Sequence, residues 1–139
     1  MKFRQLQLNE PAGKLLLRFA TGGLLIFHGV HKLLYGHSFI GLLLKEHGWP
    51  EFFRYGVPVG EVIAPIMLLL GIYTRIASLL VAFTMLMSIY LFYGSNAFKL
   101  DQFGGLNSQL NLFFLFSSIS IFFLGAGRYN LFKGNGKWN

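Results

Sequence analysis

The chain of 139 residues is rich in apolar side chains and poor in charged ones: 54% of its residues are hydrophobic and 12% are charged. A soluble domain carries about 25% charged residues, which argues against an ordinary soluble enzyme, and the high hydrophobicity excludes a disordered chain. A net charge of +7 without a dense cluster of Lys and Arg indicates contact with lipid headgroups and no nucleic-acid partner. The absence of cysteine excludes disulfides and thiol chemistry of the chain's own.

Four long apolar segments follow a short polar start, and we expect each to form a helix that crosses a bilayer. They span residues 12–35, 55–74, 75–94 and 107–125. Each is close to the ~20 residues that an α-helix needs to cross ~30 Å of hydrocarbon. A cleaved signal peptide is rejected because Arg18 interrupts the first apolar run. A soluble bundle is disfavoured because the third segment has no polar face.

The connections predict how these helices are arranged. Little more than Tyr73-Thr74-Arg75 joins the second and third segments, so these helices must be antiparallel neighbours. Residues 36–54 mix apolar and charged side chains and contain Trp49, which is typical of an amphipathic helix in the membrane interface. We therefore predict an all-α, single-domain protein over residues 1–139. It is a four-transmembrane-helix antiparallel bundle with a short interfacial amphipathic segment between its first and second helices.

The distribution of Lys and Arg predicts the orientation in the membrane. With the N-terminus inside, seven basic residues fall on the cytoplasmic side and four on the outer side, with Arg18 left out as intramembrane. The cytoplasmic set is Lys2, Arg4, Lys14, Arg75, Arg128, Lys133 and Lys137, and the outer set is Lys32, Lys45, Arg54 and Lys99. The excess predicts that both termini lie in the cytoplasm.

Polar side chains gather at one depth of this predicted bundle. At ~1.5 Å of rise per residue, six of them lie ~20–27 Å from the cytoplasmic edge: His28, Lys32, Glu61, Ser88, Tyr90 and Gln109. An ionisable group in hydrocarbon costs about 2.5–3.5 kcal/mol, so each one needs a partner. Pro65 has no N–H and frees the Glu61 carbonyl at the same place. The layer is either a structural ion pair that fixes helix register or a site that handles a ligand or protons.

The remaining polar residues receive structural interpretations. Arg18 is expected one turn inside the cytoplasmic interface, where its side chain can snorkel to the headgroups. Arg75 and Arg128 are expected to contact headgroups as well. No metal site is expected, because three histidines along one stretch do not converge on a point: His28, His31 and His37.

Six short motifs follow one another along the chain. They are Leu17-Arg18-Phe19, His28-Gly29-Val30-His31-Lys32-Leu33, Gly48-Trp49-Pro50, Glu61, Leu68-Leu69-Leu70-Gly71-Ile72-Tyr73-Thr74-Arg75 and Gly125-Ala126-Gly127-Arg128-Tyr129-Asn130-Leu131. Together they resemble the DoxX family of bacterial integral membrane proteins. The chain departs from the usual pattern at Ala126, Asn130 and Phe132, and it has Gln109 where relatives tend to carry an acidic residue. The resemblance implies a four-helix, multi-pass protein of the bacterial inner membrane. It also implies a link to thiosulfate:quinone oxidoreductase or to other membrane-bound oxidoreductases.

The leading hypothesis is that the protein is an accessory or quinone-interacting subunit of a membrane oxidoreductase. Quinone is the cofactor that this hypothesis suggests. A hydrophobic molecule with a polar head would bind in the outer-half polar layer. Glu61 would accept a proton or hydrogen bond, His28 and Lys32 would polarise a ketone-type oxygen, and Gln109 would orient the head. The alternatives are a non-catalytic scaffold that contacts partners, and a small-solute transporter, which would need a homo-oligomer because four helices are few. Catalysis by the chain itself stays open.

Overall fold

The computed structural model describes residues 9–132 and 136–139, and every regular element in this part of the chain is a helix. The predicted all-α class is therefore confirmed. The helices form four rods, which are taken below in chain order. Three residues of the predicted charge distribution lie outside the described residues: Lys2, Arg4 and Lys133.

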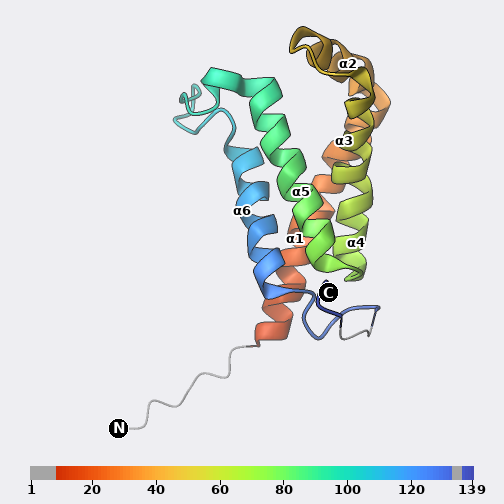
Figure 1. Cartoon of the computed structure of the whole chain (residues 1–139). Coiled ribbons are helices and arrows are strands. Elements are labelled where there is room, and N and C mark those ends of the chain that lie inside the picture. Colours follow the sequence, from red (N-terminus) through yellow and green to blue (C-terminus); the bar gives the residue numbers. More distant parts are fainter. Residues whose placement is uncertain (1–8, 133–135) are drawn as a thin grey trace.

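The helical path of the first rod continues past residue 35, where the sequence predicts its end, but it bends there, and its last helix lies across the end of the bundle (Figure 1). Helix α1 (Glu10–His31) passes without a break into a π-helical turn, η1 (Lys32–Gly36), and then into α2 (His37–Glu46). Its start has a physical cause: the Asn9 side chain accepts the N–H of Ala12 at 3.3 Å, and a proline stands in the first turn. Helix α2 buries Ile40 and Leu44 against the rest of the protein. Its place in the membrane interface stays a prediction.

The second rod is irregular in the half nearer α2. It consists of a 3-10 turn η2 (Glu51–Tyr55), α3 (Gly56–Pro58), a π-helical turn η3 (Val59–Ile63) and α4 (Ala64–Leu70). Pro65 explains the π turn, because it offers no N–H to the carbonyl of Glu61. The N–H of Ala64 instead reaches back to the carbonyl of Val59. The expected interruption at Glu61 is thus a widened turn.

A tight turn leads into the third rod. Gly71 and Tyr73 both have left-handed backbone, with φ of 69° and 44°, and the chain reverses between α4 and α5. Helix α5 (Thr74–Ser88) continues into another π-helical turn, η4 (Ile89–Tyr93), and a 3-10 turn, η5 (Gly94–Asn96). After a loop, α6 (Gln109–Leu124) forms the fourth rod.

Successive rods run in opposite directions, and the start of α1 and the C-terminal residue lie at the same end (Figure 1). The core is an apolar cluster between α1, α4, α5 and α6. Among its fully buried members are Leu25, Leu68, Val81, Met85 and Phe114. The start of α1 and the C-terminal residue lie at the same end, as an even number of membrane crossings requires. Which side of the membrane this end faces stays a prediction.

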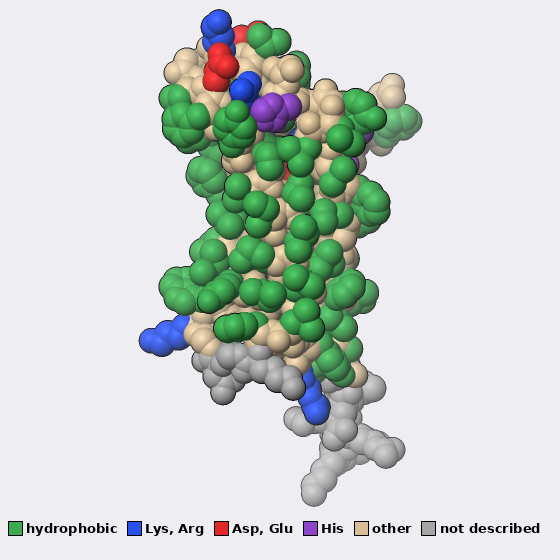
Figure 2. All heavy atoms as spheres, turned by 90° about the vertical axis from the view of Figure 1, so that its right-hand side faces the viewer, with side chains coloured by type: hydrophobic (Ala, Val, Ile, Leu, Met, Phe, Trp, Pro, Cys, Tyr) green, Lys and Arg blue, Asp and Glu red, His purple; other side chains and the backbone are tan. Residues whose placement is uncertain are grey.

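The outer surface is also apolar. Figure 2 shows hydrophobic side chains covering one face, with charged side chains toward its two ends. On α6, the exposed fractions of Phe113, Phe116 and Phe123 are 58%, 63% and 74%, and so extensive an apolar surface is rare on a soluble monomer.

Two stretches of the described chain are helices long and apolar enough to cross a membrane, Glu51–Leu70 and Thr74–Asn96. Helix α6 is apolar but has 16 residues. The 22-residue α1 contains Arg18, His28 and His31 within its length. The crossing of the bilayer by all four rods therefore stays a prediction.

Gly29 and Gly23 lie in the same helix and give a matched test of close packing. A Cβ atom at Gly29 would collide with the backbone carbonyl of Glu61, whereas one at Gly23 meets no atom within 4 Å. We expect Gly29→Ala to lower the free energy of unfolding by about 1–3 kcal/mol through overpacking. Gly23→Ala should leave it unchanged or raise it by up to ~1 kcal/mol through helix propensity. Thermal unfolding in detergent, followed by circular dichroism, measures both, and equal melting temperatures would contradict the close approach.

Candidate ligand site at the Lys32–Glu61 ion pair

A buried ion pair joins the first two rods. Lys32 begins the π turn η1 and Glu61 lies in the π turn η3, and the lysine Nζ is 2.6 Å from Glu61 Oε1. The Glu61 side chain is 1% exposed and that of Lys32 is 26% exposed. A carboxylate removed from water costs several kcal/mol unless partners replace its lost hydration. Lys32 therefore supplies the charge that allows Glu61 to lie inside the protein.

The second carboxylate oxygen of Glu61 is free. Glu61 Oε2 is buried, and no hydrogen-bond donor within the described residues reaches it. Buried polar atoms are nearly always hydrogen-bonded in folded proteins, so an exception calls for a physical explanation such as strain or a missing molecule. The ion pair thus leaves one strong acceptor buried and unsatisfied beside a cation, and a ligand group would reach it only through a movement of neighbouring side chains.

Two glycines let the neighbouring rods approach Glu61 closely. Gly29 of α1 lies directly against the Glu61 backbone carbonyl, and Gly60 lies against the Thr84 side chain of α5. A side chain at either position would force the rods apart. The carboxylate is therefore held at the contact of three rods, where lipid tails cannot surround it.

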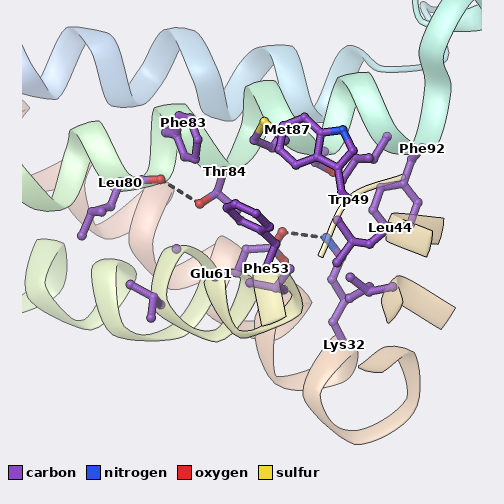
Figure 3. A pocket seen from close by; sticks show the side chains of 17 residues that line it. Lys32, Leu44, Trp49, Phe53, Glu61, Leu80, Phe83, Thr84, Met87 and Phe92 are labelled. Carbon is purple, nitrogen blue, oxygen red and sulfur yellow. Dashed lines mark hydrogen bonds and ion pairs between the residues drawn. The ribbon is translucent and has the colours of Figure 1, made fainter. Parts of the chain in front are cut away.

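A mostly apolar cavity of about 220 Å³ lies on one side of the ion pair, and it is called the apolar cavity below. Its walls come from α2, the second rod and the third rod, and Figure 3 shows the large side chains around it: Leu44, Trp49, Phe53, Phe83, Met87 and Phe92. Its polar residues are Lys32, Glu61, Thr84 and Ser88. The Thr84 hydroxyl already donates to the Leu80 carbonyl at 2.8 Å. The charged pair is therefore the strongest polar feature of an apolar space.

A second cavity of about 210 Å³, called the polar cavity below, lies between α1, the third rod and α6. His28, Ser88 and Asn111 line it together with Lys32 and Glu61. The side-chain amide of Asn111 donates to the Ser88 hydroxyl at 2.9 Å. Because Lys32 and Glu61 line both cavities, the ion pair forms part of the partition between them.

Of the six residues predicted to share one layer, four line these cavities: His28, Lys32, Glu61 and Ser88. Tyr90 and Gln109 line neither. Tyr90 is 54% exposed and its ring contacts those of His47 and Trp49. Gln109 is exposed and lies against Gly105. Depth along a helix was the basis of the prediction, and depth does not decide which way a side chain points.

Asn111 is the polar-cavity residue that the sequence reasoning missed. It lies two residues after Gln109 and so points to nearly the opposite side of α6. A signal for it exists, because Asn111 shares the helical phase of the buried residues Phe114 and Ser118. Trp49 has a role that the sequence did not predict, because its half-buried ring lines the apolar cavity; its place as an interfacial anchor stays a prediction.

Arg18 does not snorkel toward headgroups, contrary to the prediction. Its side chain is fully buried and donates hydrogen bonds of 2.5–3.2 Å to four backbone carbonyls: Leu68, Leu69, Ala126 and Tyr129. Leu68 and Leu69 belong to the last turn of α4, where the helix dipole places partial negative charge. The planar guanidinium therefore joins α1 to the end of α4 and to the chain that follows α6.

The other two arginines of this end differ from each other. Arg75 Nη1 donates to the Lys137 carbonyl at 3.0 Å, and the Arg75 backbone N–H donates to the Trp138 carbonyl at 3.1 Å. Arg75 therefore holds the C-terminal residues against the start of α5. Arg128 is exposed, and its contact with headgroups stays a prediction.

The family model named DoxX matches residues 13–94, which is more than half of the chain. The chain belongs to the DoxX family. The match contains Arg18 and both residues of the ion pair, while the motif at residues 125–131 lies beyond it. Comparisons with curated proteins and with solved structures found no match. The family and the apolar helices together make this a membrane protein.

Because Arg18 donates hydrogen bonds to four backbone carbonyls, we expect that no other side chain can perform its structural role. Lysine keeps the charge but lacks the planar fork of donors, so we expect Arg18→Lys to lower the free energy of unfolding by about 2–4 kcal/mol. The exposed Arg128 provides the control, since Arg128→Lys should change it by no more than about 0.5 kcal/mol. Heating in detergent followed by size-exclusion chromatography measures the loss of folded protein. A melting temperature of Arg18→Lys equal to that of wild type would contradict the structural role.

Proposed function

We propose that this DoxX-family protein is an accessory, quinone-interacting subunit of a membrane-associated oxidoreductase. The observation that carries the proposal is the buried Lys32–Glu61 pair, with its free carboxylate oxygen, in the wall of an apolar cavity. Ligand sites are typically apolar spaces with few well-placed polar groups, and this one has that composition. The polar head of a lipid-soluble molecule would bind at the pair, and its apolar body would fill the cavity.

The pair offers both kinds of hydrogen bond that a quinone or quinol needs. The Lys32 ammonium can donate to a ring carbonyl, and Glu61 Oε2 can accept from a ring hydroxyl. Trp49, Phe53 and Phe92 offer aromatic faces to the ring. Ser88 is within the same lining and is the further hydroxyl available to the head.

An apolar tail has a way out of the cavity into lipid. Val59 and Phe83 both line the cavity and are 38% and 62% exposed on the outer surface. A tail that leaves between them would stay in apolar surroundings along its whole length. This route supports a ligand that enters from the membrane.

The chain itself has no cysteine to exchange electrons. In this proposal the redox change is therefore carried by the ligand and by a partner oxidoreductase, and the protein binds and orients the head. Its location in the bacterial inner membrane with both termini in the cytoplasm belongs to the same proposal. The placement of the described ends on one side of the bundle supports it.

A non-catalytic scaffold is the second candidate, and one observation favours it. The Lys32–Glu61 contact is already short at 2.6 Å, as in a purely structural ion pair. In that case the pair would fix the register of the first two rods, and function would lie in contacts with partner proteins.

A binding experiment with Glu61→Gln distinguishes the quinone-interacting subunit from the scaffold. The substitution keeps the volume but replaces a charged acceptor, whose hydrogen bond contributes about 1.5–3 kcal/mol. We expect a short-chain ubiquinol or menaquinol analogue to bind wild type and to bind Glu61→Gln about ten- to a hundredfold more weakly. The quinone form quenches Trp49 fluorescence, and recovery of that fluorescence as the quinol displaces the quinone reports quinol binding, in a Trp138→Phe background that leaves Trp49 as the reporter.

The control for this experiment is Gln109→Leu, because Gln109 lines neither cavity. It should bind the analogue as wild type does. Absence of binding in every form, together with a lower melting temperature of Glu61→Gln, would overturn the ligand proposal and favour the scaffold.

A further inference from the structure

We infer that the polar cavity is a water-filled passage through which Glu61 exchanges protons with the aqueous phase at the end of the bundle opposite the start of α1 and the C-terminal residue. The inference concerns the side of the ion pair that the proposed ligand does not occupy. Its biological purpose, release or uptake of a ligand proton, rests on the proposed function. The existence of the passage does not.

The lining of the polar cavity suits water. His28, Ser88 and Asn111 provide donors and acceptors around a space of about 210 Å³, well above the ~30 Å³ that one water molecule occupies in the liquid. Enclosed spaces hold ordered water when they are polar and offer each molecule two to four partners. The apolar cavity, of similar volume, shares Ser88 with the polar cavity and adds only Thr84, whose hydroxyl already donates to the Leu80 carbonyl.

The position of the polar cavity connects it to the end of the bundle. Lys32 directly follows the last residue of α1, Tyr93 ends η4, and Asn111 lies in the first turn of α6. These three places lie toward the end of the bundle away from the start of α1 and the C-terminal residue (Figure 1). At the rim, His28 and Leu110 are exposed. In this proposal, water enters from that end of the bundle and does not cross the apolar core.

Glu61 is the carboxylate that lines both cavities. Its Oε1 is held by Lys32 and its Oε2 has no partner within the described residues. The titratable groups that line the cavities beside it are Lys32 and His28 from the first rod and Tyr93 from the third. Helix α6 contributes the neutral amide of Asn111.

The proton step balances without a further reactant. A ligand hydroxyl in the apolar cavity breaks its O–H bond and keeps the electron pair on its oxygen, while the proton forms a new O–H bond on Glu61 Oε2. The carboxyl then passes that proton to a water molecule in the polar cavity and returns to the carboxylate that pairs with Lys32. The proton of the ligand head thus reaches water, while the ligand itself stays in the membrane.

The absence of cysteine makes the native chain a ready background for a labelling test. A thiol reacts as the thiolate, which forms in water and not in apolar surroundings. Single cysteines are introduced as Asn111→Cys in the polar cavity and Met87→Cys in the apolar cavity. Ser118→Cys, on the buried side of α6 and in neither cavity, is the matched control. Each variant in lipid vesicles is treated with the charged reagent methanethiosulfonate ethyltrimethylammonium.

We expect Asn111→Cys to react at least a hundredfold faster than Ser118→Cys and Met87→Cys. Ser88→Cys, a near-isosteric change in the partition, provides a second reporter and should also react. Equal protection of Asn111→Cys, Ser88→Cys and Ser118→Cys would overturn the passage. Rapid labelling without quinol binding would sink the proposed function and leave the passage standing. Quinol binding together with full protection of Asn111→Cys and Ser88→Cys would support the proposed function and overturn the passage.

Discussion

The burial of one carboxylate imposes most of the constraints on this structure. Glu61 lies inside an apolar protein, where its charge is tolerable only beside Lys32. To bring the two residues together, the first two rods approach at Gly29 and the second and third approach at Gly60. Each partner also lies in a π-helical turn. Such turns often mark functional positions, because the widened backbone redirects the side chains.

Two cations at opposite ends of the molecule, the buried Arg18 and the half-buried Lys32, are neutralised in different ways. Arg18 is surrounded by backbone carbonyls, which together use most of its donors and leave a joint with a structural role. Lys32 meets a carboxylate that keeps a free oxygen. A saturated site has no capacity left for chemistry, whereas an unsaturated one can still bind. This difference is why the functional proposal rests on the Lys32–Glu61 pair and not on Arg18.

The motifs of the family acquire a spatial meaning in the structure. Arg18 near the start of the chain, Leu68 and Leu69 at the end of α4, and Tyr129 in the closing motif are far apart in sequence and meet at one guanidinium. The motif that contains His28 and Lys32 meets Glu61 at the other end. The family match over residues 13–94 contains Arg18, Leu68 and Leu69 of the first cluster and His28, Lys32 and Glu61 of the second.

The sequence by itself determined the helical class and the family, and it grouped four of the residues that line the two cavities. Helix rise is constant and apolar runs are long, so these properties are local and can be counted along the chain. The direction in which each side chain points around its helix axis was decided only by the tertiary structure. Tyr90 and Gln109 were predicted at the depth of this group but line neither cavity, while Asn111 lines the polar cavity. The π turns at Lys32–Gly36, Val59–Ile63 and Ile89–Tyr93 shift the phase of each rod, which a uniform period of 3.6 residues cannot follow. The partners of Arg18 come from chain segments that only folding brings together, and so its burial could not be seen in the sequence.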